Sequence, residues 1–361
     1  MKKLVVFSCL LVVTSLSGLV SLEEYGNSFC LTTVYGSVTI DEPVLIDLIK
    51  SPAFQRLKNI RQYGVMCYAR SEPHFTRYQH SLGVFFLVKK YGAPLAEQIA
   101  ALLHDVSHTI FSHVGDRFFK SNYFVGAKVS YQDTIHEWYL AQSGIVDILK
   151  VYGYEDACSD KAKKQYHCFD QSLPDLCADR IEYNLTGALI DGMISVEKVN
   201  EIIDHLHFEN KQWFFDDIQA AKKFGLISVA LSELRWGSPW SGFIDHSASQ
   251  ALQRAYELGI ITLDDIHFST DDVMWQKLIT NNDSSIARYI QRIVHCQGCW
   301  SLGTPEDHDL YVHAKFSGTD PLVKTEQGLQ RLTTVDADYK REFDRVKKLI
   351  VCGYYLKIKR D

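Results

Sequence analysis

Hydrophobic residues recur along most of the chain with the spacing of amphipathic helices. Residues 45–49, 51–62, 213–234 and 250–256 place apolar side chains three and four positions apart, with polar residues between them. This period puts the apolar side chains on one helix face, where they can pack against a core. The pattern therefore predicts a mainly α protein that is built as a helical bundle.

A few short stretches carry a different pattern. Residues 32–40 alternate around Gly36 and are rich in β-branched side chains, which predicts a small N-terminal β-hairpin. Asp41 and Ser51 precede helical segments and are expected to cap them. Residues 349–358 are strand-like, so a small C-terminal α+β lobe is expected to follow the helices.

The length favours two structural units. The 361 residues exceed the size at which one hydrophobic core usually stops growing. We therefore expect the main helical domain at residues 22–299 and the α+β lobe at residues 300–361. Residues 1–21 are predicted to be a signal peptide, because a basic start precedes an uncharged apolar run. This predicts a secreted or periplasmic protein, with a cytoplasmic or membrane-anchored protein as the alternative.

Charge and cysteine content narrow the classes of partner. The formal net charge of -6 gives no basic footprint for broad nucleic-acid binding, and no segment after residue 21 is apolar enough to span a membrane. Nine cysteines are present, and Cys158 and Cys168 could form a local disulfide in an oxidising compartment. The Cys296–Cys299 pair has no second Cys-x-x-Cys beside it, which favours a structural interpretation over a redox centre.

The chemistry centres on an adjacent His104-Asp105 pair at the end of the apolar run 100–103. Neighbouring residues on a helix diverge by about 100°, so the pair can hold an ion only from a helix end, with further ligands from elsewhere. His80 and Asp179 are candidates for those ligands. This nitrogen and oxygen set suits divalent Fe, Mn, Zn, Ni or Mg without selecting among them.

Two other carboxylates compete with Asp179 for the last ligand position. Asp175 precedes it by one helical turn, and Glu182 follows it closely. Arg77 lies three residues before His80 and is placed to reach a phosphate group.

Several motifs together resemble one known family. They are the hairpin at residues 32–40, the Ser-Pro-x-Phe-Gln-Arg-Leu segment at 51–57, the Arg-Tyr-Gln-His-Ser-Leu-Gly segment at 77–83, the His104-Asp105 pair and the Asp-Arg-x-x-Tyr segment at 179–183. They resemble the HD-domain metal-dependent phosphohydrolases, and among these the dNTP triphosphohydrolases that include the sterile-alpha-motif and HD-domain protein. The resemblance covers residues 32–256, and the sterile-alpha-motif domain has no counterpart.

The resemblance implies a fold and a set of site residues. The fold is an HD-domain helical bundle, with His80, His104, Asp105 and Asp179 as metal ligands. The Asp179-Arg180-x-x-Tyr183 spacing favours Asp179 as the fourth ligand. Further implied residues are those that contact phosphate and transfer protons, His108, His113, Asp116 and His136, and those that bind substrate, Gln62, Arg77, Arg180, Tyr183 and Tyr256.

Arg180 stands where the family carries a lysine and keeps the positive charge. Three other departures from the family pattern bear on the substrate and on regulation. Tyr63 stands where these hydrolases carry a leucine beside the sugar. Near Ala248 the chain lacks an arginine that contacts phosphate in the family. The extended C-terminal regulatory region is mostly missing, so nucleotide-driven tetramer formation is not expected, although the pattern leaves room for a homo-oligomer.

Two classes of function follow. The first is a metal-dependent phosphohydrolase acting on nucleotides, with (deoxy)nucleoside triphosphates as leading substrates and a nucleotide phosphomonoesterase or phosphodiesterase as the related alternative. The second is a non-catalytic nucleotide-binding protein with the same fold. The complete ligand set and histidine cluster favour the enzyme.

Overall fold

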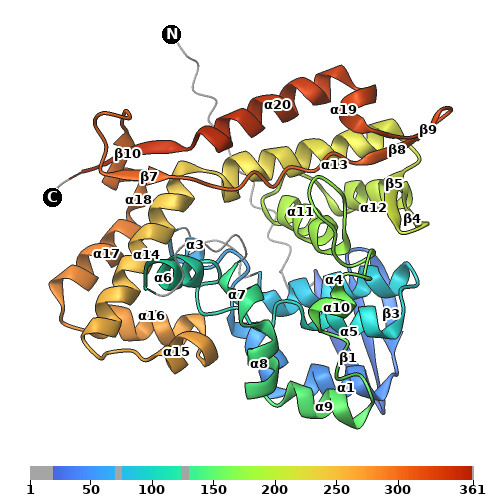
Figure 1. Cartoon of the computed structure of the whole chain (residues 1–361), viewed down its shortest axis with the longest axis horizontal. Coiled ribbons are helices and arrows are strands. Elements are labelled where there is room, and N and C mark those ends of the chain that lie inside the picture. Colours follow the sequence, from blue (N-terminus) through green and yellow to red (C-terminus); the bar gives the residue numbers. More distant parts are fainter. Residues whose placement is uncertain (1–18, 70–74, 123–129, 360–361) are drawn as a thin grey trace.

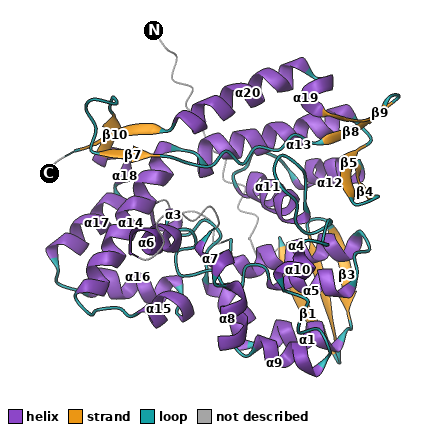
Figure 2. Cartoon of the chain, viewed as in Figure 1, coloured by secondary structure: helices purple, strands orange, loops and turns teal. Residues whose placement is uncertain are grey.

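The computed structural model describes residues 19–69, 75–122 and 130–359 (Figure 1). Helices dominate, and three small sheets lie at the edges of the molecule (Figure 2). The predicted mainly α fold is therefore confirmed. Within these residues no helix combines the length and the apolar character needed to cross a bilayer.

The helices of the first half begin after the N-terminal sheet. Their bounds are α1 Pro43–Lys50, α2 Pro52–Arg56, η2 Leu57–Asn59, α3 Met66–Ala69, α4 Arg77–Lys90, α5 Leu95–Leu103, α6 Val114–Asn122, α7 Tyr131–Thr134, α8 His136–Gln142, α9 Ile145–Val151, α10 Asp160–Lys163, α11 Ala178–Ile190 and α12 Val196–Asp204.

The second half opens with two long helices joined by a π-helical turn. The bounds are α13 Ile218–Leu231, the turn η3 Ser232–Trp236, α14 Pro239–Glu257, α15 Leu263–Phe268, α16 Asp271–Thr280, α17 Ser284–Val294, α18 Cys296–Cys299, α19 Leu332–Val335 and α20 Ala337–Cys352.

Each of the three sheets consists of short strands. The N-terminal sheet is antiparallel and joins β1 Val20–Tyr25, β2 Ser28–Thr33 and β3 Gly36–Ile40 in that order. A second sheet has the order β4 Leu206–Glu209, β5 Gln212–Phe215, β8 Leu322–Thr325 and β9 Gly328–Arg331, with β5 and β8 parallel. The third places β10 Tyr354–Ile358 between β6 Trp300–Leu302 and β7 Leu310–Val312.

Helix α4 is the centre of the fold and packs against both α5 and α11. It begins with a capping box, in which Thr76 accepts from the Gln79 backbone N–H and the Gln79 side chain accepts from the Thr76 N–H. Most of its side chains are buried, which its apolar run at residues 82–88 permits. Helix α5 ends at Leu103, and α11 begins at Ala178, so the candidate ligands lie where three packed helices meet.

Several local predictions can be compared with the structure. The hairpin is confirmed and gains β1 as a third strand, and Ser51 caps α2 by accepting from Phe54 N–H. The Asp41 cap is wrong, because Glu42 occupies the N-cap position of α1 without a side-chain bond. The helix predicted from Trp213 is also wrong at its start.

Residues 213–215 belong to strand β5, which lies between β4 and β8 and buries its aromatic side chains there. Similarly, residues 349–352 complete α20, and only 354–358 form a strand.

The two ends of the chain bear on the predicted units. Residues 1–18 lie outside the described residues, while Val20 and Ser21 pair with β2. The signal peptide and the boundary near residue 300 stay predictions. Strand β8 joins a sheet with β5 of the preceding part of the chain. The expected Cys158–Cys168 disulfide is not formed, because both are free thiols buried in the apolar core, where burial raises the pKa of Cys158 to about 12.

A largely buried loop follows α5 and carries His108 and His113. Phe111 and Ser112 adopt left-handed backbone conformations with φ of 56° and 55°, which side-chain-bearing residues rarely do. Asp271 stabilises this loop, because its two oxygens accept from the backbone N–H of Phe111 at 2.7 Å and of Arg61 at 2.8 Å. Gly64 is required beside it, since a Cβ there would lie 2.5 Å from the Phe111 carbonyl oxygen.

Arg56 holds the same loop through its carbonyl groups. Its guanidinium donates to the backbone oxygens of Val106, His108 and Ser269, with the His108 bond at 2.8 Å. The arginine in the predicted Gln-Arg-Leu motif is therefore a positioning residue for the loop.

We predict that Asp271→Ala lowers the free energy of unfolding by about 3 kcal/mol, because two buried N–H donors lose their acceptor. The matched control is Asp264→Ala on α15, whose side chain is exposed and which should change stability by less than about 0.5 kcal/mol. Urea denaturation measures both. Equal stability of the two variants would show that Asp271 does not hold the loop.

Candidate metal centre

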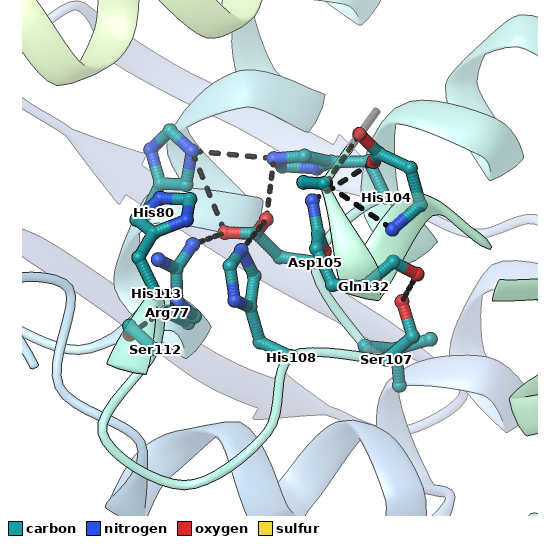
Figure 3. A network of polar contacts seen from close by, with 12 residues as sticks. Arg77, His80, His104, Asp105, Ser107, His108, Ser112, His113 and Gln132 are labelled. Carbon is teal, nitrogen blue, oxygen red and sulfur yellow. Dashed lines mark hydrogen bonds and ion pairs between the residues drawn. The ribbon is translucent and has the colours of Figure 1, made fainter. Parts of the chain in front are cut away.

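Four predicted ligands converge at the meeting point of α4, α5 and α11. Figure 3 shows three of them, His80, His104 and Asp105. The Nε2 atoms of His80 and His104 are 3.2 Å apart, and His80, His104 and Asp105 offer ligand atoms that all lie within 4.8 Å of one another. Asp179 Oδ1 lies 3.0 Å from His80 Nε2 and 3.8 Å from His104 Nε2. Two ligands on an ion about 2.1 Å away are separated by about 3.0 to 3.4 Å at right or tetrahedral angles. The His80–His104 and His80–Asp179 distances fit this range, whereas Asp179 lies farther from His104.

The hydrogen bonds on the far side of each imidazole determine which nitrogen faces the cluster as an acceptor. His104 Nδ1 lies 2.8 Å from the Ala101 carbonyl oxygen, so Nδ1 carries the proton. His80 Nδ1 bonds the Glu182 carboxylate in the same way. In the neutral rings both Nε2 lone pairs therefore point to one place, together with carboxylate oxygens. Such a set requires a positive charge between its members, and a divalent ion fits.

The electrostatics of the cluster support the same conclusion. Burial would lower the pKa of His80, but Glu182, Asp179 and Asp105 outweigh it and raise that pKa to about 10. Burial opposes ionisation of Asp105, yet Arg77, His104 and His108 hold its pKa well below the ordinary value. Asp179 likewise has a lowered pKa despite burial, chiefly because of its bond with His80. The carboxylates stay ionised and attract a cation.

Exposure shows the side from which the cluster can be approached. The side chains of His80 and Asp105 are 1% and 4% exposed, whereas that of Asp179 is 31% exposed. The cluster is therefore most accessible from the Asp179 side.

Glu182 is an outer partner of the cluster and not a fourth ligand. It is fully buried, bonds His80 Nδ1 and accepts from Thr186 Oγ1 at 2.6 Å. Gly83 makes room for it, since a Cβ there would lie 2.7 Å from Glu182 Oε1. Tyr35, at the β2–β3 turn, bonds Thr186 from behind at 2.9 Å, so the N-terminal sheet supports this arrangement.

Asp175 also lies outside the cluster. It precedes α11 and pairs with Arg331 at 2.5 Å. The structure therefore places Asp179, and neither Asp175 nor Glu182, beside the two imidazole Nε2 atoms.

Arg77 lies in the core of the site and is 3% exposed. Its guanidinium pairs with Asp105 Oδ2 at 2.5 Å and donates to Ser112 Oγ at 2.8 Å, and Ser112 Oγ donates to the Arg61 carbonyl oxygen. Arg77 thus orients Asp105 and ties it to the buried loop. Its contact with phosphate stays a prediction.

His108, His113 and Asp116 form a second group beside the ligands. His108 Nε2 lies 3.2 Å from Asp105 Oδ1, and its ring meets that of His113 edge to face at 5.1 Å between centroids (Figure 3). His113 is exposed and bonds Asp116 through Nδ1 at 3.1 Å, while Asp116 also accepts from the Tyr131 N–H at 2.6 Å. Burial and the Arg77 cation lower the pKa of His108 to about 3, so this ring is neutral.

His136 approaches the cluster from the start of α8. Its Nδ1 lies 3.0 Å from Ser107 Oγ, whereas its buried Nε2 has no hydrogen-bond partner among the described residues. Burial, together with Lys163, lowers its pKa to about 3. His136 is therefore neutral at physiological pH.

Besides Arg77, four residues are predicted to bind substrate, and each makes contacts within the protein. Arg180 turns back to donate to the Asp175 carbonyl oxygen at 2.9 Å and to Cys177 Sγ. Tyr183 packs against Trp236, and Tyr256 packs against Phe118. Gln62 bonds the Phe75 carbonyl through its backbone, and its buried Oε1 has no partner within the described chain. Their contacts with substrate stay predictions.

Reading the sequence missed the residues that orient the ligands. Arg56, Ser112 and Asp271 act through contacts between distant segments, and Asp271 contacts residues 160 and 210 positions away. No local spacing signals such pairs. Arg56 lies inside the Ser-Pro-x-Phe-Gln-Arg-Leu motif, which draws attention to it without revealing its distant partners.

The chain is similar to known proteins in sequence and in fold. The HD domain family model matches residues 77–155, which carry the His104-Asp105 pair and the surrounding histidines. The Bacillus subtilis protein YdhJ is 31% identical over 329 residues, which are 90% of this chain and 97% of YdhJ. The chain belongs to the HD-domain family.

Other relatives of this HD-domain protein carry enzyme names. The metal-dependent phosphohydrolase cns2 of Cordyceps militaris is 28% identical across 80% of this chain and 83% of its own length. The bovine deoxynucleoside triphosphate triphosphohydrolase SAMHD1 is 31% identical across 31% of this chain and 22% of its own length. A phosphohydrolase structure from Bacteroides thetaiotaomicron has a TM-score of 0.68 at 16% identity, covering 94% of this chain and all of that one, and shows the shared fold.

We predict that binding of a divalent ion releases about one proton at pH 8. The His80 pKa near 10 means that the metal-free protein holds this proton at any lower pH, and an ion at Nε2 displaces it. Apparent affinity should accordingly rise with pH by roughly tenfold per unit up to about pH 10. Calorimetric titration with Mn²⁺ in two buffers of different ionisation enthalpy measures the released proton. Binding without proton release would contradict this assignment.

We also predict that Glu182→Gln weakens metal binding by about 10- to 100-fold, because the bond to His80 Nδ1 loses its charge. The matched control is Glu209→Gln on β4, where the side chain is exposed. The same titration compares them. Unchanged affinity in Glu182→Gln would limit Glu182 to a packing role.

Proposed function

We propose that this HD-domain protein is a metal-dependent phosphohydrolase of nucleotides, with (deoxy)nucleoside triphosphates as the leading substrates and nucleoside and triphosphate as products. The observation that carries the proposal is the convergence of two oriented imidazole nitrogens and two ionised carboxylates on one partly exposed position. A divalent ion there would supply Lewis-acid polarisation of the phosphoryl group and of a water molecule.

The protein residues contribute orientation and proton transfer. Arg77 and His108 hold Asp105 from two sides, which keeps the carboxylate fixed as charge develops on the phosphoryl group. His113 is proposed as the acid that protonates the leaving oxygen. It is exposed, and its Nδ1 bond to Asp116 leaves Nε2 available. His136 is less suited, because its lowered pKa leaves the ring neutral at physiological pH, and a neutral imidazole is a much weaker acid than an imidazolium.

The choice of triphosphates as substrates rests on the motif residues around the metal centre and on the similarity to SAMHD1. SAMHD1 is similar to this chain over a limited stretch, and the motif residues His80, His104-Asp105, Asp179 and Tyr183 stand in the order that the resemblance requires. Arg180 supplies a cation next to Asp179 that could turn from the Asp175 carbonyl to a phosphate.

A nucleotide phosphomonoesterase is the second candidate, and the distribution of cations is the observation that supports it. Ala248 is completely buried in α14, so no cation reaches the site from that position. Arg77 is already engaged by Asp105 and Ser112. The cations of the site therefore match the charge of one phosphate group better than the charge of three.

Hydrolysis of a nucleotide panel by the full chain tests the proposal. Nucleoside mono- and triphosphates would be incubated with Mn²⁺, Mg²⁺, Fe²⁺, Ni²⁺ or Zn²⁺, and products identified by mass. Outer partners of a metal already contribute about 10- to 100-fold, so Asp105→Asn should reduce turnover by at least about 100-fold. Asp264→Ala, an exposed carboxylate outside the site, serves as the control.

The products decide between the candidates. Intact triphosphate from the wild-type protein would support the triphosphohydrolase, whereas orthophosphate from monophosphates would support the phosphomonoesterase. Absence of turnover with every metal, or full activity in Asp105→Asn, would refute the enzymatic proposal.

A further inference from the structure

We propose that Trp236 and Tyr183 form a binding wall for the nucleobase of the substrate, with Trp236 as its principal ring. This inference rests on the proposed function, because it names what the organic part of the substrate contacts. Trp236 ends the π-helical turn η3 between α13 and α14, and π-helical turns are frequent at functional sites.

Helix α11 links the metal centre to the aromatic rings. Tyr183 follows Asp179 by four residues on α11, so the two share one helix face and are about 6 Å apart along its axis. The Tyr183 ring meets the Trp236 indole edge to face, with centroids 5.8 Å apart. A substrate whose phosphate lies at the exposed side of Asp179 thus has its sugar beside Tyr183 and its base near Trp236.

The Trp236 indole is partly exposed and carries a hydrogen-bond donor that is unpaired within the described part of the chain. The rings of Trp236 and Tyr183 are half-buried and retain exposed surface. The indole Nε1 of Trp236 is buried and has no hydrogen-bond partner among the described residues. Buried donors are almost always satisfied, so an acceptor on a ligand or on water is expected here. An aromatic face with a donor at its edge suits a nucleobase, which has a flat ring and acceptor atoms.

An ion pair and a packed ring hold the Trp236 side of the binding wall in place. Arg235 makes a two-pronged ion pair with Asp191, the C-cap of α11, with Nε to Oδ2 at 2.8 Å. This ion pair is nearly buried and ties the π-helical turn to the helix that carries Asp179. Tyr63 packs behind the indole at 5.6 Å between centroids. The ring is therefore held in place before a ligand arrives, which reduces the entropy lost on binding.

Ligands that carry only one half of a nucleotide test the proposal. Nucleosides contain the ring without phosphate, and inorganic triphosphate contains phosphate without the ring. In the full chain with Mn²⁺, Trp236→Leu should weaken nucleoside binding by at least about tenfold, the loss of one base–aromatic stack, and leave triphosphate binding unchanged. Trp236→Phe, which keeps a ring, should remain within about threefold of the wild type.

The matched control is Trp300→Leu on β6. Trp300 is also a half-buried tryptophan whose buried Nε1 has no hydrogen-bond partner among the described residues. Its ring packs on Phe243 of α14, whereas the Trp236 ring packs on Tyr183 of α11. The Trp300→Leu variant should bind nucleoside and triphosphate as tightly as the wild type does. Calorimetry measures the affinities, and thermal denaturation verifies that each variant is folded.

The outcomes separate this inference from the proposed activity. Selective loss of nucleoside binding in Trp236→Leu supports the wall even if no nucleotide is hydrolysed. Equal weakening of both probes, no effect on either, or absence of nucleoside binding to the wild type would overturn it, even if turnover is observed.

Discussion

The site depends on one constraint, the convergence of two imidazole lone pairs and two carboxylates within a buried cluster. Each imidazole is turned to face the same position by a partner on its far side, the Ala101 carbonyl for His104 and the Glu182 carboxylate for His80. Such a set is unstable without a positive charge at its centre. A proton on His80 satisfies it in part, and a divalent ion satisfies it fully.

The remainder of the fold maintains that convergence. Helix α4 lies between α5 and α11, so ligands separated by about a hundred residues meet at its N-terminal half. Arg56 and Asp271 then hold the strained loop after α5, which brings His108 against Asp105 and presents His113 to solvent. The π-helical turn at Trp236 is fixed to α11 in a similar way, through Arg235 and Asp191.

The metal-ligand set, in which the family resemblance chose Asp179, stays a prediction. Local signals in the sequence predicted the helical fold and the hairpin, because amphipathic and alternating spacings have few structural outcomes. They failed where tertiary contacts decide. Trp213 lies in an apolar run that suits a helix as well as a strand, and only pairing with β4 and β8 selects the strand. Glu182 could be a ligand or an outer partner, and the room made by Gly83 decides this. Asp271 lies in the first turn of α16, and nothing in that local pattern indicates its bonds to Phe111 and Arg61.

The most direct test of the central claim is the anomalous scattering of crystals grown with Mn²⁺ and measured near the manganese absorption edge. The account predicts one strong peak per chain, coordinated by the Nε2 atoms of His80 and His104 and by oxygens of Asp105 and Asp179. Absence of a peak at this position, or a peak bound by other residues alone, would contradict it.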